Sequence, residues 1–206
     1  DAAEVVDAGP LDAALRHALT VTSLAARPAP KVSVVIDGGG ALGLDAVSAD
    51  VRLRAEAAAG GGAVFHVSLG GDGGSAARLG AVAPAYCLDV AARLLEVIAG
   101  RGRDARARDL LAAEGIGPFR LAVSHLLSSV ACRSESAGSE MDSRLRGNER
   151  RAEIIACHRL RDGSLACGIG LAFGHADAAV LQHLTEAASA GGASGMRAAP
   201  GRALLI

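Results

Sequence analysis

Polar and apolar residues alternate in three segments of the first hundred residues. The segments cover residues 31–37, 49–55 and 63–69. A period of two is typical of strands with one buried face, as in antiparallel sheets. We therefore expect three antiparallel strands. If they are neighbours in register, their polar side chains share one exposed sheet face, made of Lys31, Ser33, Arg52, Arg54, His66 and Ser68.

Two stretches with apolar residues three or four positions apart predict helices that cover this sheet. The first lies within residues 1–24, and its apolar face consists of Leu11, Leu15, Ala18 and Leu19. The second has Pro84 in its first turn and ends at Gly100. Its predicted buried stripe consists of Val90, Leu94, Val97 and Ile98. The sequence therefore predicts a sheet domain with covering helices over residues 1–100.

The rest of the chain divides into a linker and a second domain. Residues 101–151 could hold a short helix, but residues 128–150 are polar, rich in Ser and Arg, and predict a disordered insertion. Residues 152–206 predict two strands joined by an Asp162-Gly163 turn, a helix capped by Asp177 that buries Val180, Leu181 and Leu184, and a final strand. This β-β-α-β order is half of a ferredoxin-like sandwich, so the expected fold class is α+β.

Gly38, Gly40 and Gly43 have the G-x-G-x-x-G spacing of a dinucleotide-binding turn. That turn requires a buried parallel strand before it and a helix after it, whose N-terminus faces the pyrophosphate. Here the preceding strand alternates, and the segment that follows has no helical period. We therefore expect these glycines to form a turn between antiparallel strands, with no nicotinamide or flavin cofactor.

Composition and charge narrow the function classes. The chain has 206 residues, is half hydrophobic and has a net charge of −1, which gives no bulk affinity for nucleic acid or membrane surfaces. It contains no run near the roughly 18 apolar residues of a membrane span, and its first residues do not resemble a signal peptide. We expect a soluble cytoplasmic protein that binds neither nucleic acid nor membrane.

The histidines and cysteines show no metal-binding spacing. His175 and His183 lack an i, i+4 relation, and no two cysteines form a close pair of the C-x-x-C kind. The four cysteines are Cys87, Cys132, Cys157 and Cys167. Only Cys157 and Cys167 are expected to approach each other, on paired strands. The sequence therefore predicts no metal ligands and no cofactor-binding residues.

Motifs in both predicted domains resemble one enzyme superfamily. PAPKVSVVIDGGGALGLDAVSADVRLRA and FHVSLGGD are similar to the P-x-K-F-x-F-x-x-D-x-G-G, D-[IV]-x-[LF] and LGG pattern of nitrite and sulfite reductases. GSLACGIGLAFGHADAAVLQHLTEAA and MRAAPGRALLI resemble the second ferredoxin-like half-domain, which usually closes with R-x-T-P-W-R-A-L-L-L. The resemblance is greatest to the precorrin-3B synthase branch. Val32 replaces the usual Phe, and Ala199 and Gly201 replace Thr and Trp.

The resemblance implies an oxidoreductase of aerobic cobalamin biosynthesis, which oxidises precorrin-3A with dioxygen to a hydroxy-lactone. In that family the reaction uses a [4Fe-4S] cluster and a further iron centre. The family's amino-terminal half-domain and its cysteine cluster have no counterpart in these 206 residues. The resemblance therefore implies a truncated chain that is inactive alone, lacks the iron ligands, and has the missing segments of the same enzyme as partners.

An anionic tetrapyrrole substrate requires cationic side chains. Lys31 matches the lysine of the first motif, while Arg197 and Arg202 match the two arginines of the terminal one. Precorrins carry many carboxylates, which arginine can bind in bidentate fashion. The expected substrate-binding residues are Lys31, Arg52, Arg54, Arg197 and Arg202. The catalytic residues stay unknown, and two alternatives stay open: a fragment of an assimilatory nitrite or sulfite reductase, or a non-catalytic remnant.

Overall fold

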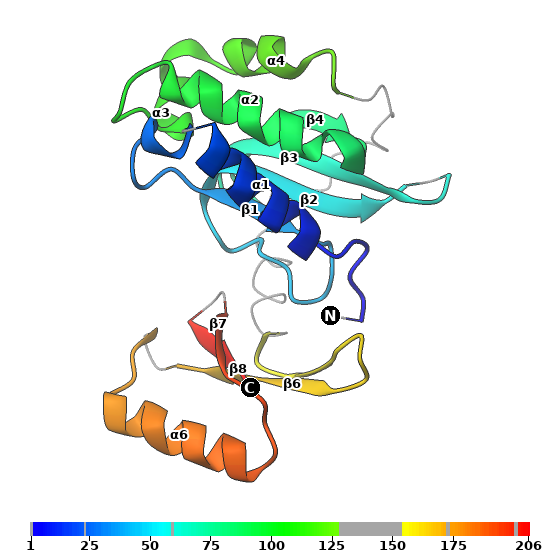
Figure 1. Cartoon of the computed structure of the whole chain (residues 1–206), viewed down its shortest axis with the longest axis vertical. Coiled ribbons are helices and arrows are strands. Elements are labelled where there is room, and N and C mark those ends of the chain that lie inside the picture. Colours follow the sequence, from blue (N-terminus) through cyan, green and yellow to red (C-terminus); the bar gives the residue numbers. More distant parts are fainter. Residues whose placement is uncertain (1, 23, 59, 128–153, 172–173, 200–201) are drawn as a thin grey trace. The chain divides into compact units, whose positions relative to one another are not determined.

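The computed structural model describes residues 2–22, 24–58, 60–127, 154–171, 174–199 and 202–206. It divides into two compact units, shown in Figure 1. Residues 4–137 form the N-terminal unit, and residues 138–206 with residues 1–3 form the C-terminal unit. The insertion predicted at residues 128–150 lies outside the described residues.

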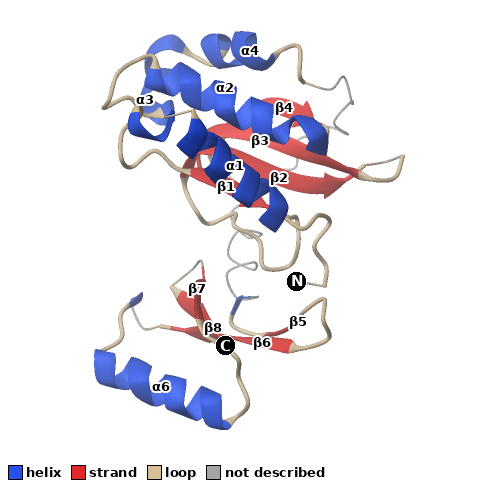
Figure 2. Cartoon of the chain, in the orientation of Figure 1, coloured by secondary structure: helices blue, strands red, loops and turns tan. Residues whose placement is uncertain are grey.

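Helices cover a four-stranded sheet in the N-terminal unit. The helices are α1 (Gly9–Val21), α2 (Cys87–Ala99), α3 (Ala107–Glu114) and α4 (Gly117–Val123), with 3-10 turns η1 (Leu24–Ala26) and η2 (Pro84–Tyr86). The strands are β1 (Val34–Asp37), β2 (Ala49–Ala57), β3 (Ala63–Gly71) and β4 (Ala77–Val82). Figure 2 shows α1 and α2 side by side across the sheet.

The core of this unit lies between the sheet and its helices. The odd-numbered residues are buried from Ala49 to Ala55 on β2 and from Phe65 to Gly71 on β3, among them Leu53 and Phe65. Helix α2 buries the predicted stripe, with Val90, Leu94 and Ile98 fully enclosed and Val97 half-buried. Alternation in the strands and the 3.6-residue period in the helix therefore locate the core correctly.

The strand order is β1-β2-β3-β4. Strands β2, β3 and β4 pair antiparallel, but β1 runs parallel to β2, with Val34 opposite Val51. The prediction of three antiparallel strands is therefore wrong for the first pair. Residues 38–48 cross from the end of β1 to the start of β2 instead of forming a hairpin turn.

Two further differences concern the end of this unit. Strand β4 was not predicted, and residues 107–123, expected in a linker, form α3 and α4. Helix α4 packs on α2 and buries Phe119 and Val123. The first predicted domain therefore ended too early, because these helices complete its core.

The C-terminal unit has a smaller antiparallel sheet and one long helix. Its elements are β5 (Cys157–Arg159), β6 (Leu165–Gly170), α6 (Ala178–Ala190), β7 (Arg197–Ala199) and β8 (Ala203–Leu205), and the strand order is β5-β6-β8-β7. The expected α+β class and the β-β-α-β order are confirmed. The final strand, however, is divided into the hairpin strands β7 and β8.

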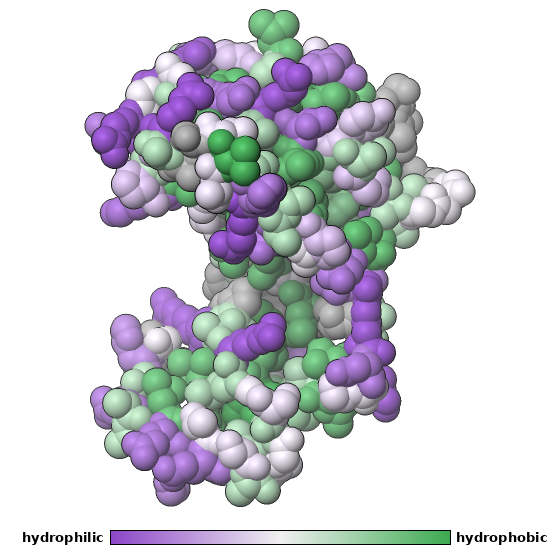
Figure 3. Space-filling view, viewed as in Figure 1, coloured by the Kyte–Doolittle hydropathy of each residue, from purple (hydrophilic) through white to green (hydrophobic). Residues whose placement is uncertain are grey.

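Helix α6 is less buried than its sequence predicts. Leu181 and Leu184 are half-buried, but Val180 is 57% exposed, so its predicted burial is wrong. Asp177 occupies the N-cap position without making a side-chain capping hydrogen bond. Hydrophobic side chains are visible on the surface of this unit in Figure 3.

Candidate functional site

The sheet of the N-terminal unit brings together four of the six polar residues expected to share one face, whereas Lys31 and Ser33 precede β1. Arg52 lies opposite Ser68, and Arg54 lies opposite His66, in the register of β2 and β3. Lys31 is exposed in the turn before β1. The candidate face is therefore formed on β2 and β3.

The polar face holds the connecting loop, residues 38–48, against the sheet. Arg52 donates hydrogen bonds to the carbonyl oxygens of Leu44, at 3.2 Å, and Val47. The Nη1 group of Arg54 lies 2.6 Å from both carboxylate oxygens of Asp45. Two arginines thus fix the loop that carries the glycine-rich motif.

Arg52 is only 3% exposed, which contradicts the expectation of an exposed position. Burial lowers the pKa of its guanidinium from the ordinary value, and the Asp45 carboxylate is the strongest opposing influence. The Arg52 Nη2 atom lies 3.8 Å from Asp45. Because both of its terminal nitrogens bind loop carbonyl oxygens, Arg52 holds the loop on the face.

Asp37 anchors the start of the same loop. It is 4% exposed and accepts hydrogen bonds from the backbone N–H groups of Gly39, at 2.8 Å, and Leu44, at 2.7 Å. A Cβ atom on Gly38 would lie 2.4 Å from the Val6 carbonyl oxygen, and one on Gly39 would lie 2.2 Å from that of Ala55. These two glycines therefore permit close backbone packing, and the loop has no helix like that of a dinucleotide site.

The turn after β3 contacts the loop. The N–H of Gly73 donates to the Asp45 carbonyl oxygen at 2.8 Å. Asp72 accepts hydrogen bonds from the hydroxyl and N–H of Ser75 and from the N–H of Gly74. These bonds, above all the one from the Ser75 hydroxyl, hold the pKa of Asp72 below its ordinary value. The loop that follows the D-x-G-G motif thus contacts the turn that follows the LGG motif, through Asp45 and Gly73.

Sequence reasoning missed the acidic residues of this region. Asp50 is 2% exposed and accepts hydrogen bonds from the Arg106 guanidinium and the N–H of Ala107, at the start of α3. It also accepts the N–H of Ser33. Asp45 contacts both arginines of the face, Arg52 and Arg54. Asp50 begins the D-[IV]-x-[LF] motif, which is a signal in the sequence, but only the fold shows which cation each carboxylate meets.

Arg54 retains a buried polar group without a partner. Among the described side chains, its Nε–H is the buried group that donates no hydrogen bond. The side chain as a whole is 28% exposed, so part of the guanidinium reaches the surface. A buried donor without an acceptor is unfavourable, so this N–H group would gain from any acceptor that reached it.

Arg197 and Arg202 form a separate pair in the C-terminal unit. Both are exposed, Arg197 at the start of β7 and Arg202 just before β8. Arg202 has a φ of 64°, a left-handed conformation, and its side chain packs near Gly174. The β7–β8 hairpin therefore presents both arginines to solvent.

The described cysteines do not fit an iron–sulfur cluster. The sulfurs of Cys157 and Cys167 lie 2.7 Å apart, while burial raises the pKa of Cys87 to about 12. Cys132 lies outside the described residues. Within the described ranges there is no group of three or more His, Cys, Asp or Glu side chains that could hold a metal. A [4Fe-4S] cluster requires four converging thiolates, and the described residues bring together two.

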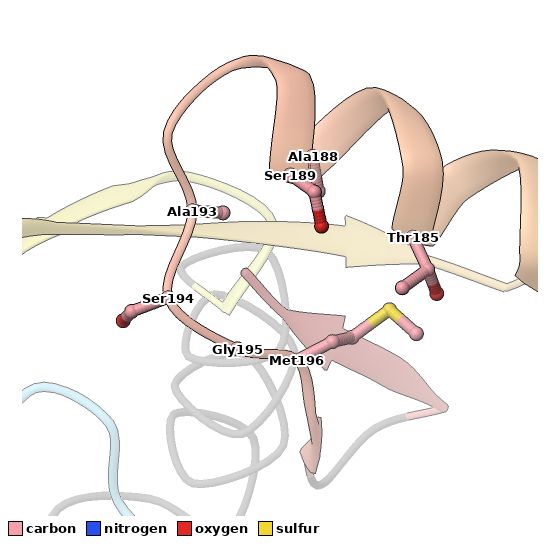
Figure 4. A pocket seen from close by; sticks show the side chains of 7 residues that line it. All are labelled: Thr185, Ala188, Ser189, Ala193, Ser194, Gly195 and Met196. Atoms are coloured by element: carbon pink, nitrogen blue, oxygen red, sulfur yellow. The ribbon is translucent and has the colours of Figure 1, made fainter.

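Two hollows lie away from the predicted substrate-binding residues. One, of about 500 Å³, lies between α1 and β1 and is lined mainly by aliphatic side chains, with Asp12 and Arg16 as its charged residues. The other, of about 210 Å³, lies between α6 and residues 193–196, and Figure 4 shows the Met196 side chain extending toward Thr185. None of the five predicted substrate-binding residues lines either hollow.

Comparison with solved structures identifies the class of fold. The chain is similar over its whole length to the NirA protein of Mycobacterium tuberculosis, with a TM-score of 0.65 and 16% identity, and covers 38% of that chain. The fold expected from the resemblance to the nitrite/sulfite reductase superfamily is thereby confirmed. No helix in the described part of the chain is long and apolar enough to cross a membrane.

Comparison with curated proteins gives a more specific similarity. The chain is 34% identical over all 206 residues to a precorrin-3B synthase from a Sinorhizobium species and covers 41% of that protein's length. No protein-family profile matches the chain. The chain is therefore similar throughout to part of a precorrin-3B synthase, and the resemblance drawn from its motifs is confirmed.

Proposed function

We propose that this chain is the tetrapyrrole-contacting part of a precorrin-3B synthase-like oxidoreductase in cytoplasmic cobalamin biosynthesis. The observation that carries the proposal is the 34% identity to a precorrin-3B synthase over the full 206 residues. The chain spans 41% of that relative. The remaining segments of such an enzyme would be the partners of this chain and would supply the iron and iron–sulfur ligands.

The proposed substrate contacts are the cationic side chains predicted from the sequence. Lys31, Arg197 and Arg202 are exposed, and Arg54 is partly exposed with a buried Nε–H that has no described partner. Each could donate charge-assisted hydrogen bonds to the carboxylates of a precorrin. Arg52 contributes differently, because its bonds to the loop carbonyls hold Asp45 and Arg54 in place.

The loop network gives this proposal a physical basis. A guanidinium that is already oriented loses less conformational freedom on binding than a mobile one. Asp45 orients Arg54 by contacts from both carboxylate oxygens to Nη1. The Nε–H group of the same guanidinium has no acceptor among the described residues, so a substrate carboxylate would supply one.

Direct binding of a polycarboxylate porphyrin tests the proposal. Calorimetric titration of the full chain is compared with Lys31→Ala and Arg54→Ala, each of which removes one positive charge. Loss of one charge-assisted contact should weaken binding about 10- to 100-fold, equivalent to about 1.5–3 kcal/mol. Arg101→Ala is the matched control, because Arg101 is partly exposed and paired with Glu114 outside the face.

The control separates specific contacts from bulk charge. Equal weakening by all three substitutions would show a nonspecific electrostatic effect and contradict the assignment. Absence of binding by the parent chain would contradict the proposal that these residues suffice for tetrapyrrole contact. Circular dichroism of each variant checks that Arg54→Ala does not act by unfolding the loop region.

A further inference from the structure

Cys157 and Cys167 face each other across the first hairpin of the C-terminal unit. Strands β5 and β6 pair antiparallel with these two residues directly opposite, and their sulfurs lie 2.7 Å apart. Figure 2 shows β5 and β6 as neighbours, and β5 is the edge strand of its sheet. Two thiols that converge in this way can be joined in a disulfide when an oxidant accepts their two electrons.

The hydrogen-bond register favours a bond between them. The N–H of Leu160 donates to the Ser164 oxygen, and the N–H of Gly168 donates to the Ala156 oxygen. Hydrogen-bonded and non-hydrogen-bonded pairs alternate along an antiparallel ladder, so Cys157 and Cys167 form a non-hydrogen-bonded pair. Their Cα atoms then lie about 4.5 Å apart, within the range of about 4.4–6.8 Å that a disulfide spans.

The pair is also accessible to small oxidants. Cys157 is exposed and Cys167 is partly exposed, whereas Cys87 is buried. The hydrogen bond with Cys157 raises the pKa of the Cys167 thiol. The reaction therefore begins at Cys157, the more exposed sulfur, and Cys167 is placed to complete it.

We infer that Cys157 and Cys167 are a reversible disulfide site, a modification independent of the proposed tetrapyrrole chemistry. A low-molecular-weight disulfide is the oxidant. The Cys157 thiolate attacks one oxidant sulfur and releases one thiol, and Cys167 then attacks the Cys157 sulfur and releases the second. Two S–H bonds are lost, one S–S bond forms within the protein, and the oxidant gains two electrons and two protons.

The new bond would fasten the edge strand β5 to β6 across the Asp162–Gly163 turn. The hairpin already carries an Asp162 carboxylate that accepts hydrogen bonds from the N–H and hydroxyl of Ser164. Oxidation therefore crosslinks a hairpin whose turn is preorganised, and reduction removes the crosslink between β5 and β6. The site is a thiol–disulfide switch in the outermost strand of this sheet.

Peptide mapping of the full chain tests the inference. The chain is incubated with oxidised glutathione, its remaining thiols are blocked with N-ethylmaleimide under denaturing conditions, and it is digested with trypsin. Each of the four cysteines falls in a different tryptic peptide. The expected product joins residues 152–159 to residues 162–197, weighs about 2 Da less than the two peptides together, and disappears with dithiothreitol.

Thiol counting supplies the second readout. Oxidation should lower the number of blocked thiols from four to two, and Cys157→Ser or Cys167→Ser should abolish the crosslink. Cys132→Ser is the matched control and should retain it. A chain that keeps four blocked thiols, or whose main crosslink contains Cys132 or Cys87, would overturn the inference.

Discussion

Replacing the Arg52 guanidinium tests whether this residue stabilises the loop of residues 38–48 or is only a surface charge. Arg52→Met removes every polar group while keeping an unbranched apolar stem of similar length. The side chain is 3% exposed and donates to the Leu44 and Val47 carbonyl oxygens. The substitution therefore leaves two loop carbonyls without their donor, and Asp45 with only the other arginine.

The expected destabilisation follows from these contacts. A hydrogen bond involving a charged group contributes about 1.5–3 kcal/mol, and Arg52→Met removes the two that Arg52 donates to Leu44 and Val47. We therefore expect Arg52→Met to lower the free energy of unfolding by about 3–5 kcal/mol, a large part of the about 5–15 kcal/mol typical of a domain. Surface arginines should contribute less than about 0.5 kcal/mol.

Urea unfolding gives the change in the free energy of unfolding for the N-terminal unit alone. Tyr86 is the single tyrosine of a chain without tryptophan, and it lies in η2 of that unit, so its fluorescence reports on the relevant sheet. With a denaturant slope of about 2 kcal/mol per molar, the expected midpoint shift is about 1.5–2.5 M. Arg54→Met, at a partly exposed position, should shift the midpoint by less.

Arg101→Met provides the baseline for a charge change at an exposed ion pair. If the Arg52→Met midpoint coincided with that baseline, the loop would not depend on the buried arginine. The assignment of Arg52 as a positioning residue would then be wrong, and a direct ligand role would again be the better interpretation. Unfolding slopes equal to that of the parent are needed for the comparison to hold.

Three further predictions follow from the same contacts and from the cysteines. Gly39→Ala should lower the free energy of unfolding by about 2 kcal/mol or more, because φ is +79° and the new Cβ would lie 2.2 Å from the Ala55 oxygen. Gly60 lies in open space, so Gly60→Ala should change the free energy of unfolding, measured in urea, by no more than about 0.5 kcal/mol. Asp72 has a lowered pKa in the folded state, so its stabilisation is complete above about pH 4 and is lost as the pH falls through the folded value. Asp72→Asn should therefore destabilise at pH 7, and the difference between its unfolding midpoint and that of the parent should shrink as the pH falls below about 4. Anaerobic reconstitution with iron and sulfide should leave no stoichiometric bound iron after desalting, and a reducible visible chromophore would contradict this.

Local patterns identified the elements whose stability depends on one buried face. The stripe of α2 and the alternation of β2 and β3 were predicted because apolar spacing reports directly on burial. The direction of β1 was not predictable in this way. Its alternation looks the same in a parallel or an antiparallel pair, and the 11-residue connection, residues 38–48, fits either a long hairpin loop or a short crossover.

The candidate face likewise depends on a feature that local sequence patterns do not report. Parity placed Arg52 and Arg54 on one side of the sheet correctly, but it could not show that a loop covers them. Arg52 therefore looked like an exposed cation, although the fold buries it beneath Leu44 and Val47. Helix α6 shows the opposite error, because its apolar spacing predicted burial of Val180, which the described structure leaves exposed.

The central claim is that this chain corresponds in function to the part of precorrin-3B synthase that it resembles. The most direct measurement replaces the matching segment of the Sinorhizobium relative with these 206 residues and assays precorrin-3B formation. The account predicts activity well above that of the relative from which the segment has been deleted, and loss of that activity when Lys31→Ala and Arg54→Ala are combined in the chimera. A chimera that folds and carries its iron centres, yet forms no more precorrin-3B than the deletion, would contradict the account.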